Sequence, residues 1–210
     1  MKDSLTEIVF ILDRSGSMSR LTNDTIGGYN AFIEQQKKEP GEAMLTTVLF
    51  DDKYELLHDG VVLKDVKPLT DKEYFARGTT ALMDAVGRTI NDVGNRLSKL
   101  DEAERPGKVV VVITTDGMEN ASKEFSKKQI KDMITHQTEK YNWQFMFLGA
   151  NIDAASEAES IGIPIAFAAN FTASKVGTDA LYKTMSKTVT GYRSTGEVSD
   201  SWAGDLKIDL

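Results

Sequence analysis

The stretch EIVFILDRSGS, residues 7–17, decides how this chain folds. Its apolar residues Ile8–Leu12 form an unbroken run, which is typical of a strand buried on both faces of a parallel sheet. The run ends at Asp13, and open α/β sheets bind their ligands outside the carboxyl ends of the strands. Ser15 and Ser17 follow in a tight turn, and the glycine between them lets the backbone bend. The stretch therefore predicts a polar binding turn at the end of a central strand.

This turn offers one carboxylate and two hydroxyl oxygens. Such an all-oxygen donor set suits a hard divalent cation such as Mg²⁺ rather than zinc or copper. A purely structural interpretation is also open, because Asp and Ser are common helix caps and turn residues. Two further turns of similar composition, described below, favour the metal interpretation.

The composition fits a single α/β domain of 210 residues, of which 40% are apolar. The net charge of -7 without a basic stripe argues against nucleic acid and against an anionic membrane surface as partners. The absence of cysteine excludes disulfides, thiolate metal sites and cysteine nucleophiles. No apolar stretch has the length of a membrane span or the flanks of a signal peptide, so we expect a cytoplasmic protein.

Hydrophobic periodicity and turn residues predict alternating strands and helices. The predicted helices are residues 22–38, 81–100, 126–141, 154–161 and 173–192. The predicted strands are 8–12, 43–50, 108–115, 143–148 and 165–168, with an antiparallel edge strand made of 53–57 and 61–63. This order predicts an α/β, doubly wound (Rossmann-like), mostly parallel six-stranded sheet with one antiparallel edge strand and helices on both faces. We expect residues 1–193 to form the domain, and 194–210 to form a tail that folds back on it or contacts a neighbour.

Two other turns are expected at the same edge of the sheet as Asp13. Thr80 directly precedes the apolar periodicity of the long helix, and Asp116 ends the most apolar strand. Right-handed crossovers place the carboxyl ends of parallel strands together, which would bring these residues to Asp13. Taken alone, Thr80 could be a helix cap and Asp116-Gly117 a turn. Taken together, three oxygen-rich turns favour a shared metal site.

The order Asp13-x-Ser15-x-Ser17, Thr80, Asp116 resembles the metal-ion-dependent adhesion site (MIDAS) of the von Willebrand factor type A domain family. The flanking residues agree as well, namely Met18, Leu82-x-Asp84-Ala85 and the Thr115-Asp116-Gly117 triplet. The resemblance covers residues 5–170. Thr79 stands where the family often has a second glycine, so Thr79 is the alternative to Thr80 as a ligand, and the spacing to Leu82 favours Thr80.

This resemblance implies a function for the chain. It implies a Mg²⁺ site, with Mn²⁺ as the alternative ion, that leaves one coordination position for a carboxylate of a partner. The implied ligands are Asp13, Ser15, Ser17, Thr80 and Asp116. We therefore expect a non-enzymatic adaptor that binds an Asp or Glu of another protein, with an ATPase-linked complex as one setting. The residues expected to form the partner-binding rim are Arg14, Met18, Arg77, Glu119 and Asn120.

A metal-dependent phosphohydrolase of the haloacid-dehalogenase type is the alternative. That class also has an acid at the end of a strand, but a second acid usually follows two residues later, where this chain has Ser15. It also needs a lysine, for which Lys108 or Lys123 would have to serve. No glycine-rich nucleotide-binding loop and no nucleophile elbow occurs in the sequence. The adhesion-site interpretation is therefore favoured.

Overall fold

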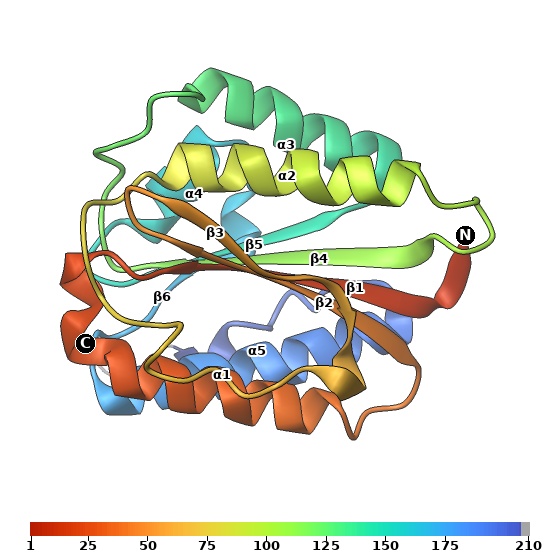
Figure 1. Ribbon diagram of the computed structural model, residues 1–210, viewed down its shortest axis with the longest axis horizontal. Coiled ribbons are helices and arrows are strands. Elements are labelled where there is room, and N and C mark those ends of the chain that lie inside the picture. Colours follow the sequence, from red (N-terminus) through yellow and green to blue (C-terminus); the bar gives the residue numbers. More distant parts are fainter. Residues whose placement is uncertain (207–210) are drawn as a thin grey trace.

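A six-stranded sheet with helices on both faces forms the centre of the protein (Figure 1). The structure is a computed structural model that describes residues 1–206. The strand order is β3-β2-β1-β4-β5-β6. The parallel strands are β1 (Lys2–Asp13), β2 (Glu42–Phe50), β4 (Pro106–Thr115), β5 (Gln144–Gly149) and β6 (Ala168–Asn170). The edge strand β3 (Tyr54–Val62) runs antiparallel to β2, which confirms the predicted fold class.

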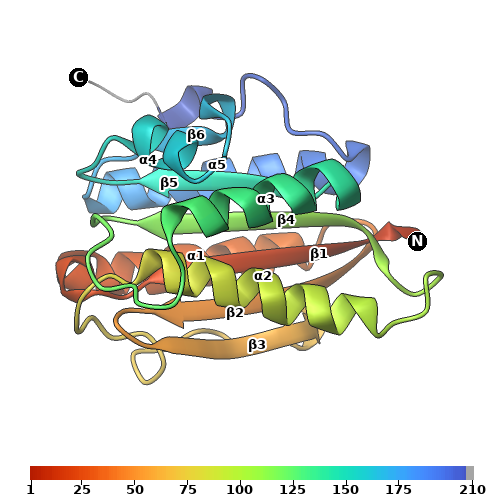
Figure 2. The same ribbon diagram turned by 90° about the horizontal axis from the view of Figure 1, so that it is seen from above.

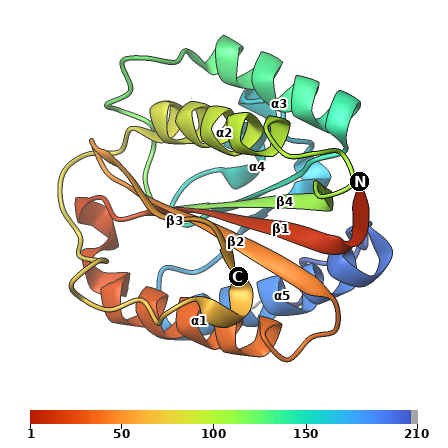
Figure 3. The same cartoon turned by 45° about the vertical axis from the view of Figure 1, so that its right-hand side comes forward.

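The helices form two layers. Helices α1 (Thr22–Gln36) and α5 (Lys175–Thr195) cover one face of the sheet, and α2 (Leu82–Ser98), α3 (Lys127–Tyr141) and α4 (Ala154–Ser160) cover the other (Figures 1 and 3). Within residues 1–206, none of these helices combines the length and the apolar character that crossing a membrane requires.

The position of β1 in the centre of the sheet explains why Ile8–Leu12 are apolar without interruption. Ile8, Phe10 and Leu12 pack in the core beneath α1 and α5. Val9 and Ile11 pack in the second core, beneath α2 and α3. Because both faces of β1 are covered by helices, alternation between polar and apolar residues is absent from this run.

Strands β1 and β3 include residues that lie outside their predicted ranges. Strand β1 begins at Lys2, whose amide donates to the carbonyl of Arg105 at 2.8 Å, because pairing with a neighbour extends a strand whatever its side chains are. The two predicted edge pieces form one strand, β3, whose pairing with β2 shifts register near Thr47. Gly60 adopts a φ of 60°, a conformation that glycine takes without strain, and this irregularity keeps the strand continuous.

The C-terminal region also corrects a prediction. Residues 165–167 form a 3₁₀ turn, in which the amide of Phe167 donates to the carbonyl of Pro164, and β6 starts only at Ala168. Helix α5 continues past the predicted end at residue 192 to Thr195, and Gly196 follows it in a left-handed conformation. The following residues fold back on the domain, where Trp202 is buried and its Nε1 donates to the carbonyl of Ala166 at 2.7 Å. Residues 207–210 of the expected tail lie outside the described residues.

The connection from β3 to α2 leads to the carboxyl edge of the sheet. It begins with a 3₁₀ turn at Leu63–Asp65. The side chain of Asn30 on α1 bonds both the amide and the carbonyl of Leu69, which pins the connection to the α1 layer. Tyr74 is fully buried in the same segment. This anchoring positions the residues that follow, up to the start of α2.

Candidate metal centre

Three turns meet at the carboxyl edge of the sheet, at the left of Figure 2. They follow β1, precede α2 and follow β4. Strands β1 and β4 are neighbours, and Leu12 is in register with Thr114, so Asp13 and Thr115 lie side by side. The chain leaves β1 toward one face and β4 toward the other, so the turns lie at the topological switch point, where sheets of this type bind ligands.

Asp13 is buried and held in place by hydrogen bonds. Its Oδ1 accepts from the amide of Ser15 and its Oδ2 accepts from Oγ1 of Thr115, both at 2.6 Å. The hydroxyl of Tyr74 donates to the main-chain carbonyl of Asp13 at 2.5 Å. Burial raises the pKa of Asp13 to about 6, and the nearby charge of Asp116 acts in the same direction. The carboxylate is therefore fixed in position in a site that disfavours its negative charge.

The hydroxyl groups of the three turns converge. Oγ of Ser15 lies 3.1 Å from Oγ of Ser17, which in turn donates to Oδ1 of Asp116 at 2.5 Å. A Cβ atom added to Gly117 would lie 3.2 Å from Oγ1 of Thr80 and 3.4 Å from Oγ of Ser17. Gly117 thus lies between hydroxyls from two different turns, and a larger residue there would press on both.

The geometry also separates the two neighbouring threonines. Thr80 is buried, and its Oγ1 faces Gly117. Thr79 is exposed. The structure therefore directs the hydroxyl of Thr80 toward the other two turns, in agreement with the spacing argument from the sequence.

Main-chain hydrogen bonds hold the turns against one another. The amide of Gly16 donates to the carbonyl of Gly78 at 3.1 Å. Thr80 and Asn120 exchange two bonds of 3.0 Å, one from the amide of Thr80 to Oδ1 of Asn120 and one from the amide of Asn120 to the carbonyl of Thr80. The arrangement of the site is therefore built into the backbone.

The donor set fits a divalent cation. Burial raises the pKa of Asp116 as it does that of Asp13, and neither carboxylate forms an ion pair within residues 1–206. No group of three or more His, Cys, Asp or Glu that could hold a metal occurs in the same residues, so any ion here would be bound largely by hydroxyls. Two buried carboxylates without a counter-charge, beside three converging hydroxyls, suit a hard cation such as Mg²⁺.

Three of the five residues expected at the rim have other roles. Arg14 is fully buried and pairs with Asp51 and Glu55, so its placement on an exposed rim is wrong. Met18 is also buried and belongs to the core beneath α1. The carboxylate of Glu119 accepts hydrogen bonds from the amide of Met83 and from amides of its own loop, which satisfies a free N–H at the start of α2.

The other two rim residues remain accessible. Asn120 is exposed, although its Oδ1 is bonded to the amide of Thr80. Arg77 is partly exposed, and its Nε donates to Oδ2 of Asp51 at 2.7 Å. Two further residues beside the turns are exposed, Met118 by 63% and Phe75 by 40%. The ring of Phe75 lies under the guanidinium groups of Arg14 and Arg77, at 5.4 and 5.0 Å from its centroid.

Sequence reasoning missed the two residues that hold Asp13. Thr115 could have been found, because it ends the strand next to β1 and precedes Asp116. Tyr74 lies in a connection without periodicity, and no local signal predicts that its hydroxyl reaches a strand end 61 residues away in sequence.

The strand order, the antiparallel edge strand and the three turns at the switch point define the fold of a von Willebrand factor type A domain. The chain resembles the mussel byssus protein PTMP1, with a TM-score of 0.64 and 19% identity over 89% of this chain and 46% of that one. It also resembles a structure of PTMP1 with a zinc-occupied MIDAS motif, with a TM-score of 0.60 and 17% identity over 88% of this chain and 46% of that one. A third similar structure is the vWF domain of the pilus tip protein Mfa5 from Porphyromonas gingivalis, with a TM-score of 0.63 and 11% identity over 93% of this chain and 98% of that one.

These comparisons establish the fold. The chain spans about half the length of the mussel protein, 46% by alignment. No protein-family model matches the sequence. No curated protein matches it either.

Proposed function

We propose that this chain is a divalent-metal-dependent protein-binding domain of the adaptor type. The observation that supports it is the convergence of the hydroxyls of Ser15, Ser17 and Thr80 with the carboxylates of Asp13 and Asp116. These five side chains would hold the ion, with Mg²⁺ favoured by the oxygen donors and Mn²⁺ as the alternative.

The chemistry of the site explains how an acidic protein would attract an acidic partner. A bound divalent ion supplies positive charge at one point of a chain whose net charge is -7. Thr115 and Tyr74 keep Asp13 oriented, and the contacts between turns keep the hydroxyls together. The partner would contribute an Asp or Glu carboxylate to the remaining coordination position.

The exposed residues around the turns indicate what else the partner presents. Met118 offers an apolar surface beside Asp116, and Phe75 with Arg77 offers an aromatic and cationic surface beside Gly78. We therefore propose that the partner's acidic residue is flanked by apolar side chains. An ATPase-linked complex stays a prediction.

The phosphohydrolase alternative has less support. Lys108 lies at the amino end of β4, where its Nζ donates to the carbonyls of Asp3 and Arg193, whereas Asp116 follows the carboxyl end. Ser15 stands at the position of the general acid/base, and its hydroxyl, which lies 3.1 Å from Oγ of Ser17, is not an acid that could protonate a leaving group. Lys123 is exposed in the loop before α3. These placements favour a binding role over hydrolysis.

Titration calorimetry with MgCl₂ and MnCl₂ tests the metal site. We expect Asp116→Asn and Asp13→Ala to abolish measurable binding while the fold remains, because Asp13 is the last residue of β1 and Asp116 follows the end of β4. Asp132→Asn is the matched control, since Asp132 is an exposed acid that pairs with Lys128 on α3. Unchanged Mg²⁺ affinity in Asp13→Ala would refute the proposal. A pulldown with and without chelator then tests whether partner binding depends on the metal.

A further inference from the structure

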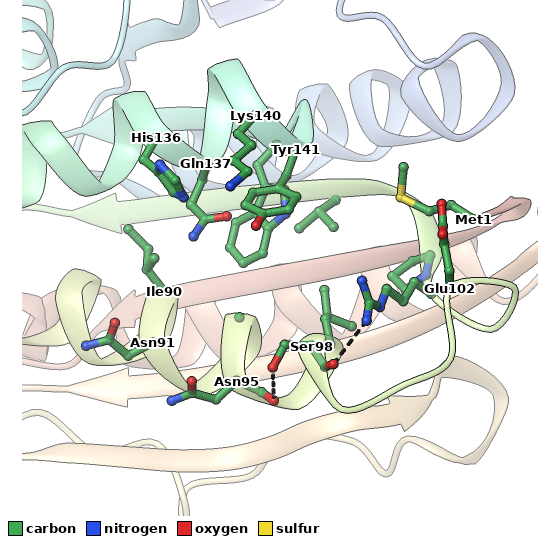
Figure 4. Close-up of a pocket in the computed structure, with 16 residues that line it drawn as sticks. Met1, Ile90, Asn91, Asn95, Ser98, Glu102, His136, Gln137, Lys140 and Tyr141 are labelled. Atoms are coloured by element: carbon green, nitrogen blue, oxygen red, sulfur yellow. Dashed lines mark hydrogen bonds between the residues drawn. The ribbon is translucent and has the colours of Figure 1, made fainter.

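A groove opens at the edge of the sheet opposite the three turns (Figure 4). It lies between the C-terminal halves of α2 and α3 and reaches the first residues of β4. Its volume is about 530 Å³, within the roughly 300–1,000 Å³ that small-molecule sites occupy. Because Pro106 begins β4 and Asp116 follows its far end, the groove is separate from the candidate metal centre.

The spacing of the two helices explains the groove. In Figure 2, α2 and α3 diverge toward their C-terminal ends. Near their start the ring of Phe125 fills the gap so closely that a Cβ atom on Gly87 would lie 2.7 Å from it. Two helical turns later, a Cβ atom on Gly94 would meet only Nε2 of Gln137, at 3.9 Å. Packing therefore does not require glycine at residue 94, even though glycine in the middle of a helix lowers the stability of that helix. The small size of Gly94 leaves the groove open.

The inner surface of the groove is apolar and aromatic. Ile90, Val109 and Trp143 are buried and form its floor. Figure 4 shows Tyr141 and Gln137 projecting from α3 toward α2, and Ile90 projecting from α2 toward α3. The rings of Tyr141 and Trp143 offer surfaces on which a planar aromatic ligand can stack.

The mouth of the groove offers neutral hydrogen-bonding groups on both walls. The amide side chains of Asn91 and Asn95 line the α2 wall, and that of Gln137 lines the α3 wall. None of these three side-chain amides makes a hydrogen bond to the part of the chain that the structure describes. Each amide carries both a donor and an acceptor, so a ligand with an amide-like edge would be matched on either side.

Two cationic side chains, Lys140 and Arg105, and one anionic side chain, Glu102, line the groove. Lys140 and Glu102 carry opposite signs, and the guanidinium of Arg105 is bonded to the carbonyls of Ser98 and Leu100. The aromatic rings and the side-chain amides of the groove define the chemistry of its ligand. We propose that the groove binds a small planar aromatic molecule that bears a hydrogen-bond donor and acceptor such as a carboxamide.

The test is a titration of the intact, isotope-labelled chain with indole-3-carboxamide, followed by two-dimensional NMR. We expect saturable shifts of the Gly94 amide, the Gln137 side-chain amide and the Trp143 indole N–H, and none at Gly117 beside the metal-centre turns. Cyclohexanecarboxamide, which keeps the amide but lacks the aromatic ring, should bind at least 5-fold more weakly.

Variants at one residue provide the matched pair. Gly94→Phe should fill the groove and weaken binding at least 10-fold, whereas Gly94→Ala should leave the affinity within about 3-fold, as expected from the open space at that position. Gln137→Ala, which removes one amide without adding bulk, should weaken binding several-fold and guards against misfolding of Gly94→Phe.

Three results would overturn the proposal. The first is a wild-type chain without saturable shifts up to the solubility limit of the probe, and the second is binding that survives both Gly94→Phe and Gln137→Ala. The third is self-association in sedimentation experiments that Gly94→Phe abolishes, which would identify the groove as a contact between two copies of the chain.

Discussion

Oγ1 of Thr115 on β4 donates a hydrogen bond of 2.6 Å to Oδ2 of Asp13 on β1. This bond crosses between two neighbouring strands that are 102 residues apart in sequence. It orients a buried carboxylate that no ion pair neutralises within the described residues. The position of this acid in the candidate metal centre thus depends on the pairing of β1 with β4.

Replacing Thr115 with valine removes the donor and keeps the shape of the side chain. We expect Thr115→Val to weaken Mg²⁺ binding about 10-fold or more, because partners of metal ligands typically contribute this much. Loss of the bond to a buried acceptor should also lower the free energy of unfolding by about 1–3 kcal/mol. Titration calorimetry and urea denaturation measure the two effects. Thr115→Ser keeps a hydroxyl and should retain most of the Mg²⁺ affinity. Equal Mg²⁺ affinity in Thr115→Val and the wild type would show that the bond does not contribute to metal binding.

Gly117→Ala tests the closeness of the turns. The added methyl group would lie 3.2 Å from Oγ1 of Thr80, tighter than ordinary van der Waals contact, and 3.4 Å from Oγ of Ser17, at the lower limit of such contact. We expect weaker Mg²⁺ binding with little change in thermal stability, because the two hydroxyls must move apart. Gly94→Ala, where the methyl group would meet only Nε2 of Gln137 at an ordinary contact distance of 3.9 Å, is the control and should leave metal affinity unchanged. Wild-type affinity in Gly117→Ala would place the ion's ligands elsewhere.

Asp51 makes the stability of the protein depend on acid pH. Burial by itself raises the pKa of this carboxyl, but hydrogen bonds from Arg77 and Lys53 and the charge of Arg14 hold the pKa below its ordinary value of 3.8. A group whose pKa is lowered by folding stabilises the protein above its unfolded-state pKa, and that stability is lost as pH falls through the folded-state pKa. We therefore expect the free energy of unfolding to fall below pH ~4.

Asp51→Asn should remove this dependence and destabilise the protein near neutral pH. Arg14 is fully buried and would keep only Glu55 as a counter-charge. Removing one partner of a buried ion pair in this way lowers the free energy of unfolding by about 3–5 kcal/mol. Urea denaturation between pH 3 and pH 7 measures both effects. A variant with the same acid dependence as the wild type would show that other carboxyls dominate. Asp132→Asn, at an exposed site, should match the wild type throughout.

Trp202 tests the attachment of the residues after α5. Its indole is 7% exposed, and Nε1 donates to the carbonyl of Ala166. If the tail unfolds together with the domain, we expect Trp202→Ala to lower the free energy of unfolding by about 3 kcal/mol. Trp202→Phe keeps most of the apolar surface and should lower the free energy of unfolding by only about 1 kcal/mol, because one hydrogen bond is lost. Denaturation curves for both variants that superimpose on the wild type would show that the tail does not contribute to the stability of the domain.

The sheet could be predicted from the sequence because its signals are local. Runs such as Ile8–Leu12 and Val109–Ile113, and caps such as Ser126 before α3, mark strands and helices within a few residues. The strand predicted at 165–168 was wrong in its first three residues, because Pro164 starts a 3₁₀ turn that a short apolar run does not reveal. The meeting of the three turns was also predictable, because alternating strands and helices with right-handed crossovers leave one arrangement of the carboxyl ends.

The surroundings of the site could not be predicted in the same way. Arg14 and Met118 both lie within two residues of a proposed ligand, yet one is fully buried and the other is 63% exposed. Arg14 is buried because Asp51 after β2 and Glu55 on β3 lie beside it and supply its counter-charges. Within residues 1–206, no comparable segment covers Met118.

The sequence by itself determined the alternation of strands and helices and the five oxygen-bearing side chains that end up at one edge, because periodicity and turn chemistry act between near neighbours in the chain. Only the tertiary structure decided which hydroxyl orients Asp13, which rim residues face solvent and where α2 and α3 leave a groove. These features depend on contacts between segments far apart in sequence, and burial is set by whatever segment packs on top.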